Sequence, residues 1–453
     1  MSKSSVYMKY MHQVRLFLII ISTVGLPLIV TGQEFDDLIQ TAWKNSHELR
    51  SKNFQLESAS QALLEAKALY GPDVKFGIQY TLAKGGRTIA VPVGDLMNPV
   101  YTTLNQITQS NAFPQIENVE EQFFPNNFYD ARIRITQPIY YPDLAINKKF
   151  KSELIHQKEL EIKAYKRLIS KQVMQAYIQY SSSLHAIDIL RSADTLITEA
   201  KRSTQSMIRN GVALPTALAR LENQSAELSS QITEAIANKN SAEKYLKFLL
   251  GLKEEDVIPR VEGSTDMPPA TLESEHQREE LEQLNQAVTL QNLSIKKEDN
   301  FYLPRIGAQF DAGSQDYSFG WQPYVLLGLN LEMNIYDSKK HQYRKQAAKS
   351  EIASLQSMYE HIESQFTLQR DIATENLNSA IIQANAFDSR IKATRKIYDE
   401  VFIKYKNGTA NYVELIDAQN QNTHIQIQQL LAKNNAWIKW SEFIYISALY
   451  PIQ

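Results

Sequence analysis

The sequence predicts a mainly helical protein with a smaller β-barrel part, built from two copies of one supersecondary unit. Three observations predict this fold: short segments recur, four segments alternate apolar and polar residues, and two very long stretches lack proline and glycine. The recurring segments are Ile133–Tyr141 with Leu329–Asp337, Tyr70–Pro72 with Tyr302–Pro304, and Arg209–Gly211 with Lys406–Gly408. Recurrence on this scale indicates tandem copies of a strand pair, a long helix and a returning helix.

Composition excludes several functional classes. The net charge of -2 gives no reason to expect a nucleic-acid partner, and the absence of cysteine excludes thiol catalysis, disulfides and cysteine-based metal sites. No metalloprotease motif, nucleophile elbow, phosphate loop or dinucleotide fingerprint occurs, so we expect neither an enzyme nor a cofactor. His361, beside Glu360 and Glu363, is interpreted as a polar helix residue and not as a metal ligand.

The N-terminal residues 1–32 are predicted to be a secretory signal peptide. Lys3, Lys9 and Arg15 precede an apolar core that Gly25-Leu-Pro27 interrupts. The alternative is an anchor in the cytoplasmic membrane, although the apolar run is short for a full span. We expect a first repeat over 33–256, a linker over 257–271 and a second repeat over 272–453.

Four segments of about ten residues alternate with a period of two, which is the length needed for a tilted strand to cross a bilayer. They are Val74–Ala83, Arg132–Tyr141, Arg305–Ala312 and Val325–Ile335. Two half-buried hairpins in a soluble sheet are the alternative. Four strands cannot close a barrel, so a membrane sheet would have to be completed by other copies. Two copies would give eight strands without a pore, and three would give twelve around an aqueous lumen. The residues predicted to face that lumen are Arg132, Arg134, Arg305, Gln309, Asn330 and Glu332.

The connections between paired strands, about Lys84–Phe128 and Gly313–Gln322, are predicted to be outer loops. The first contains Asn98-Pro99, Phe113-Pro114 and Phe124-Pro125, which are typical of irregular chain. We expect its aromatic residues to lie at the mouth of the barrel.

The stretches Asp143–Ile208 and Ser338–Tyr405 are predicted to be helices on the order of 100 Å long. A stripe with alternating spacings of four and three, from Ala373 to Tyr405, predicts a left-handed supercoil. Each helix ends at Asn-Gly, a left-handed stop. Returning helices are expected over Pro215–Leu250 and Tyr412–Tyr450, and shorter helices over Phe35–Leu69 and Leu272–Phe301.

Together these features resemble the TolC family of outer-membrane efflux proteins. The segments that carry the resemblance are Tyr405–Asn420, which is similar to the second tip of the family, Phe35–Leu49, and the pairs Ile139-Tyr140 and Ile335-Tyr336. The resemblance implies a homotrimer with a twelve-stranded barrel in the bacterial outer membrane and a coiled-coil helical tunnel in the periplasm. It also implies that an inner-membrane transporter and a periplasmic adaptor deliver the substrate.

The resemblance further implies a gate at the periplasmic end. Tyr405, Glu414 and Asp417 match the tyrosine and the acidic pair that narrow the pore in the family, and three copies would turn each carboxylate into a triplet. Alternatively, the two carboxylates simply neutralise the positive end of the returning helix. Ala410 and Ala217 replace charged residues of some members, so a tyrosine–carboxylate constriction is expected and not a salt-bridge lock.

The two tips are the expected adaptor contacts, although Asn-Gly could be turn chemistry alone. They comprise Arg209, Asn210, Gly211 and Val212 in the first repeat and Lys406, Asn407, Gly408 and Thr409 in the second. A periplasmic coiled-coil adaptor or scaffold without a pore is the alternative function. Neither the transported substrate nor the class of pump follows from the sequence, and protein secretion and metal export remain open.

Overall fold

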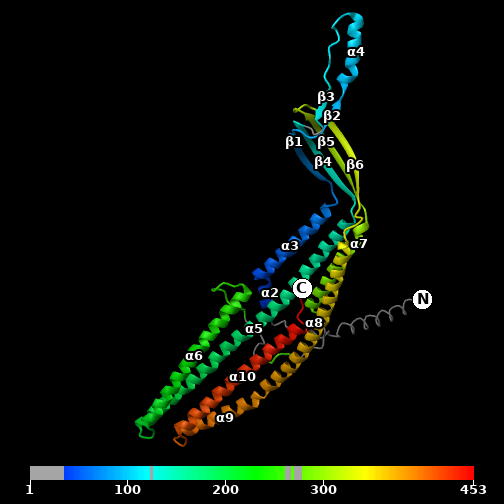
Figure 1. Ribbon diagram of the computed structural model, residues 1–453. Helices are drawn as coiled ribbons and strands as arrows, with labels where there is room; N and C mark the ends of the chain where they lie inside the picture. Colours follow the sequence, from blue (N-terminus) through cyan, green and yellow to red (C-terminus); the bar gives the residue numbers. More distant parts are fainter. Residues whose placement is uncertain (1–34, 123–125, 260, 262–266, 270–277, 453) are drawn as a thin grey trace, which may run out of the picture. The chain divides into compact units, whose positions relative to one another are not determined.

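A computed structural model describes residues 35–122, 126–259, 261, 267–269 and 278–452 (Figure 1). The predicted signal peptide and much of the predicted linker therefore lie outside the described residues. The chain divides into two compact units. Unit 1 comprises the N-terminal segment up to Gln55, Lys158–Asn285 and Ser357–Gln453, and unit 2 comprises Leu56–Gln157 and Gln286–Gln356.

Helices dominate the described chain, in agreement with the predicted fold class. They are α2 (Asp36–Asn45), α3 (His47–Ala68), α4 (Val93–Thr108), α5 (Pro142–Arg209), α6 (Pro215–Leu250), α7 (Glu279–Asp299), α8 (Lys340–Asn385), α9 (Phe387–Lys406) and α10 (Tyr412–Ile446). At 68 residues, α5 is as long as its proline-free sequence predicted. None of the helices that the structure describes has the length and apolar content required to cross a membrane.

Three helical predictions need correction. The first predicted helix breaks at Ser46, whose backbone is extended, so α2 and α3 are separate. The second long stretch divides at Ala386, which keeps a helical backbone and an amide bond to Ile382, so the direction of the chain changes little. Helix α7 begins only at Glu279, and 270–277 lie outside the described part.

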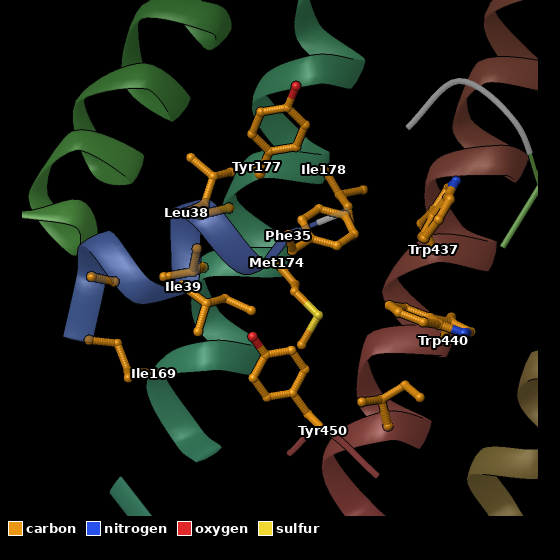
Figure 2. Close-up of a cluster of buried hydrophobic side chains, with 14 of the residues drawn as sticks. Phe35, Leu38, Ile39, Ile169, Met174, Tyr177, Ile178, Trp437, Trp440 and Tyr450 are labelled. Atoms are coloured by element: carbon orange, nitrogen blue, oxygen red, sulfur yellow. The ribbon is translucent and has the colours of Figure 1, made fainter. Parts of the chain in front are cut away.

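Unit 1 has a hydrophobic core in which aromatic side chains from distant segments meet. The Phe35 ring lies 5.9 Å from both Tyr177 and Trp437, and Trp437 lies 5.3 Å from Trp440 (Figure 2). Burial of such side chains contributes about 1.5–3 kcal/mol each, and edge-to-face ring contacts add to this. The core therefore fixes α2 against α5 and α10.

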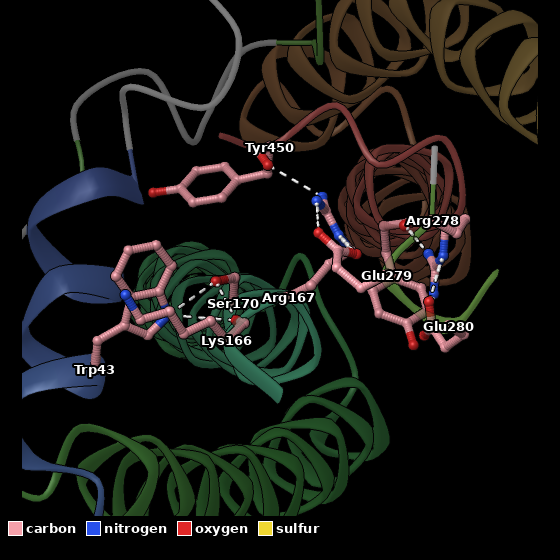
Figure 3. A network of polar contacts seen from close by, with 9 residues as sticks. Trp43, Lys166, Arg167, Ser170, Arg278, Glu279, Glu280 and Tyr450 are labelled. Atoms are coloured by element: carbon pink, nitrogen blue, oxygen red, sulfur yellow. Dashed lines mark hydrogen bonds and ion pairs between the residues drawn. The ribbon is translucent and has the colours of Figure 1, made fainter. Parts of the chain in front are cut away.

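A buried ion pair accompanies this core. Arg167 of α5 donates two hydrogen bonds to Glu279, at 2.7 and 2.5 Å, and a third to the Tyr450 carbonyl oxygen at 3.0 Å (Figure 3). Next to it, the Arg278 guanidinium lies over the rings of Phe366 and Tyr445. These contacts connect α5, the start of α7 and the segment after α10 within unit 1.

Unit 2 contains an antiparallel sheet with strand order β1-β4-β5-β6. Its strands are β1 (Asp73–Thr81), β4 (Phe128–Tyr140), β5 (Arg305–Tyr317) and β6 (Pro323–Glu332). All four predicted strands are present, and the central pair joins one strand from each half of the chain. The sheet is open, because within the described chain β1 and β6 each pair with one strand only.

The two outer connections differ from the prediction. Strand β5 continues to Tyr317, so the second connection is reduced to 318–322, where Ser318 and Phe319 have positive φ. The first connection contains a small hairpin, β2 (Thr88–Val91) paired with β3 (Val119–Gln122), and the 16-residue helix α4 between them. The prediction of irregular chain was therefore wrong for Val93–Thr108, where α4 continues through Pro99, whereas Phe113-Pro114 lies in irregular chain as predicted and 123–125 lie outside the described residues.

Candidate functional site

The sheet of unit 2 has one apolar and one polar face. The register places Val74 opposite Ile135, Ile135 opposite Phe310, and Phe310 opposite Leu327. Directly opposed residues share a face, so these four side chains form an apolar row across the sheet. Leu327, on edge strand β6, is 78% exposed. Contiguous exposed apolar side chains of this kind mark a surface that contacts a partner or a membrane.

The opposite face carries charged and amide side chains. Arg134 donates two hydrogen bonds to Asp311, at 2.8 and 2.7 Å, and Gln309 donates a third at 2.9 Å. Asn330 extends this network to Gln309 at 3.4 Å. The strand register puts all six residues that the sequence predicted to face a lumen on this side.

Asp311 lies on this face as well, as the alternation along β5 predicts. The assignment of this face to a lumen stays a prediction.

The two helical tips in unit 1 have the same backbone geometry. Gly211 and Gly408 have φ of 72° and 74°, a left-handed conformation that glycine adopts without steric cost. In the first tip the amide of Val212 bonds the Met207 carbonyl, and in the second the amide of Thr409 bonds the Lys404 carbonyl, at 2.8 and 2.9 Å. This six-residue closure is a Schellman stop. The Asn-Gly sequences therefore end both long helices as predicted.

The tips also lie next to each other. A methyl group placed on Gly408 would come within 3.9 Å of Val212 Cγ1. The Arg220 guanidinium lies 5.5 Å from the Tyr412 ring, which is a cation–π contact between α6 and α10. All eight residues predicted to bind an adaptor are exposed: Arg209, Asn210, Gly211, Val212, Lys406, Asn407, Gly408 and Thr409. The structure thus combines them into one accessible surface, whose partner stays a prediction.

Tyr405 is buried between helices. It is 3% exposed, and its hydroxyl lies 2.5 Å from Thr204 Oγ1 on α5. Because Thr204 donates its own proton to the Ala200 carbonyl at 2.8 Å, Tyr405 donates to Thr204. Tyr405 therefore ties α9 to α5 within one chain. Thr204 was missed, because no sequence signal connects residues so far apart in the chain.

Glu414 and Asp417 are exposed on the first turns of α10, with one helical turn between them. Asn411 caps this helix: its Oδ1 accepts from the amides of Val413 and Glu414, at 2.9 and 3.0 Å. Asn411 Nδ2 in turn donates to Glu414 Oε1 at 2.8 Å. Glu414 therefore takes part in capping, the alternative role considered for it. The Asn-x-x-Glu spacing could have identified Asn411 from the sequence.

No group of three or more histidine, aspartate or glutamate side chains placed to hold a metal ion occurs among the residues that the structure describes. The candidate site thus consists of a two-faced sheet in unit 2 and, in unit 1, a pair of adjoining tips with two exposed carboxylates.

Comparison with known proteins identifies the fold. No protein-family model and no curated protein sequence matches this chain. Among solved structures, the transmembrane channel CusC is similar with a TM-score of 0.72 at 14% identity, over 92% of both chains. The outer-membrane channel OprN follows with 0.69 at 13% identity, over 91% of this chain and 89% of that one. The Campylobacter jejuni outer-membrane channel CmeC gives 0.68 at 14% identity, over 92% and 85%.

These neighbours are outer-membrane channels and not enzymes. At such identities the likeness concerns the fold, and the chain has the fold of the TolC-type outer-membrane efflux channels. The fold expected for the single chain is therefore confirmed, whereas the homotrimer and the twelve-stranded barrel stay predictions.

Proposed function

We propose that this protein is the outer-membrane channel of a tripartite efflux or secretion system in a bacterial envelope. It passively conducts substrates that an inner-membrane transporter and a periplasmic adaptor deliver to it. The observation that carries the proposal is the open four-stranded sheet with one exposed apolar face and one charged face. The similar channels named above support the same role.

The open sheet requires partners if it lies in lipid, because unpaired backbone groups at β1 and β6 would be too costly there. We propose that β1 of one copy pairs with β6 of the next in a homotrimer, which gives a barrel of twelve strands. The apolar row of Val74, Ile135 and Leu327 then faces lipid, and the network of Arg134 and Asp311 faces the aqueous lumen. A dimer would leave no lumen for this polar face.

The helical end of unit 1 is proposed to extend into the periplasm and bind the adaptor through the two tips. In a trimer, Glu414 and Asp417 would each form a ring of three carboxylates, which attracts cations and narrows the pore. Tyr405 positions the residues of this constriction indirectly, because its hydrogen bond to Thr204 holds α9 against α5.

The channel is tested first by extraction from membranes. We expect the protein to require detergent for extraction and to have the mass of three chains in light scattering. The rival, a periplasmic coiled-coil adaptor or scaffold without a pore, would be released without detergent as a soluble protein. That result would overturn the proposal.

The gate is tested in planar lipid bilayers. We expect low conductance that rises when Glu414 and Asp417 are both changed to alanine, with a loss of block by divalent cations. The matched control is Glu360→Ala with Glu363→Ala, because this pair on α8 has the same spacing, charge and exposure. Equal conductance in the two double variants would remove the gate assignment and leave the channel itself standing.

A further inference from the structure

Helix α4 has two opposite stripes with the same spacing of four, three and four residues. One stripe is Gly94, Asn98, Tyr101 and Asn105, and the other is Leu96, Val100, Thr103 and Ile107. The stripes are offset by two residues, or about 200° around a helix, so they lie on opposite sides. The first contacts the segment 111–118 that returns from α4 to β3, and the second is exposed.

Two asparagine side chains hold the covered side of α4 against the return segment. Each side-chain amide bonds both the amide and the carbonyl of one backbone residue, as a paired strand would. Asn98 accepts from the Ile116 amide and donates to its carbonyl, both at 2.9 Å. Asn105 does the same with Phe113, at 3.0 and 2.7 Å. Gly94 belongs to this side because a side chain there would come within 2.5 Å of the Ile116 carbonyl oxygen. These paired bonds set the rotation of α4 about its axis and determine which side faces outward.

The outward side is apolar except for Thr103, whose hydroxyl donates to the Pro99 carbonyl within the helix. Leu96 and Ile107 are 69% and 74% exposed, and Val100 lies between them in the same stripe. Spacings of four and three residues form the seam of helices that pack against other helices. The exposed stripe of Leu96, Val100, Thr103 and Ile107, called the bare stripe below, therefore has the pattern of an interhelical contact.

We propose that the bare stripe of α4 packs against the same stripe of the other copies, so that three α4 helices form a cap at the outer end of the pore. This inference rests on the proposed trimer, in which each copy carries one such helix on the connection between β1 and β4. Copies held in one assembly meet at a high effective concentration, which favours a contact of modest area.

Charge favours a second copy over other occupants. Asp95 is the only charged residue of α4, and its carboxylate accepts a hydrogen bond from Asn118 on the return segment. Like copies can therefore approach without charge repulsion. Helices that lie on a membrane surface are rich in lysine and arginine on their polar side. Helix α4 has neither, which disfavours a lipid surface as its partner.

The experiment uses the full chain, which contains no cysteine and so allows single-cysteine crosslinking without background. Val100→Cys places a thiol in the bare stripe. Gln106→Cys is the matched control, because this exposed residue of α4 lies about 90° from that stripe. After mild oxidation of the detergent-solubilised protein, Val100→Cys should form disulfide-linked dimers about tenfold faster than Gln106→Cys. One thiol per copy around a three-fold axis allows about two-thirds of the chains to pair.

Light scattering on the same samples separates this inference from the proposed function. Particles with the mass of three chains whose Val100→Cys thiols crosslink no faster than those of Gln106→Cys would overturn the cap and leave the channel intact. Particles with the mass of one chain would overturn both. Preferential labelling of Val100→Cys by a lipid-soluble maleimide, without disulfides, would assign the stripe to lipid and also refute the cap.

Discussion

Replacement of Arg167 by methionine should destabilise the helical unit strongly, because it leaves a buried carboxylate without its partner. The side chains of Arg167 and Glu279 are only 7% and 8% exposed, and two hydrogen bonds join them. Removal of one member of such a pair costs about 3–5 kcal/mol, whereas apolar replacement of both is often close to neutral. For a unit of this size the loss corresponds to about 5–8 °C in melting temperature.

The pH dependence makes this prediction sharper. Burial alone would raise the pKa of Glu279, but the hydrogen bonds and charge of Arg167 outweigh it, so the net pKa is lowered. A carboxylate whose pKa is lowered by folding stabilises the folded state at pH values above its unfolded-state pKa, near 4.3. This stabilisation is lost as the pH falls through the pKa of the folded state. The difference between wild type and Arg167→Met should therefore be largest near neutral pH and shrink toward about pH 4 and below.

The assay is thermal unfolding of the detergent-solubilised protein, followed by circular dichroism at several pH values. Arg202→Met is the matched control, because Arg202 lies on the same helix but is exposed. The double variant Arg167→Met with Glu279→Leu should recover most of the loss. If Arg167→Met melts like Arg202→Met, or its deficit is the same at every pH, the reasoning is refuted.

Two further predictions concern single residues of unit 1. Burial, together with the charges of Glu199 and Asp399, raises the pKa of Tyr398 to about 12. The stabilisation that neutral Tyr398 gives the folded state is therefore complete below about pH 10 and should be lost as the pH rises toward about 12. Tyr398→Phe should flatten this alkaline loss in circular dichroism, and an unchanged pH profile would contradict the assignment. Gly408→Ala should cost about 1 kcal/mol or more, because φ is +74°, and should speed amide hydrogen exchange at the tip. Gly77→Ala, with open space around it, is the control and should leave tip exchange unchanged.

Regular local patterns made much of the fold predictable. Helix α6 spans Pro215–Leu250 as expected, since proline begins the helix and Gly251 follows in a left-handed cap. The break at Ser46 could not be predicted, because it depends on a distant contact. Asn45 donates to the Leu250 carbonyl at 2.9 Å, and Gly251 packs against Asn45 so closely that a side chain there would clash. Tertiary contacts of this kind leave no periodic signal.

The same limit explains the misassigned outer connection. Asn98-Pro99 is typical of a turn, and proline in a helix interior removes a hydrogen bond. The helix persists because Asn98 and Asn105 bond the backbone of a segment that follows α4. Tyr405 could be singled out by resemblance, but its partner Thr204 could not, since their contact arises only when α9 packs on α5.

The tips show which of their residues the backbone requires and which it does not. Both tips need a glycine at the left-handed stop, and both have one. If Glu414 and Asp417 served only to neutralise the start of the returning helix, the first tip should carry acids at the equivalent positions. It has Ala217 and Arg220 there, and α6 has no acidic residue in its first turn. Helix capping through Asn411 therefore accounts for Glu414 but not for Asp417, so the proposed ring of carboxylates in the pore rests most directly on Asp417.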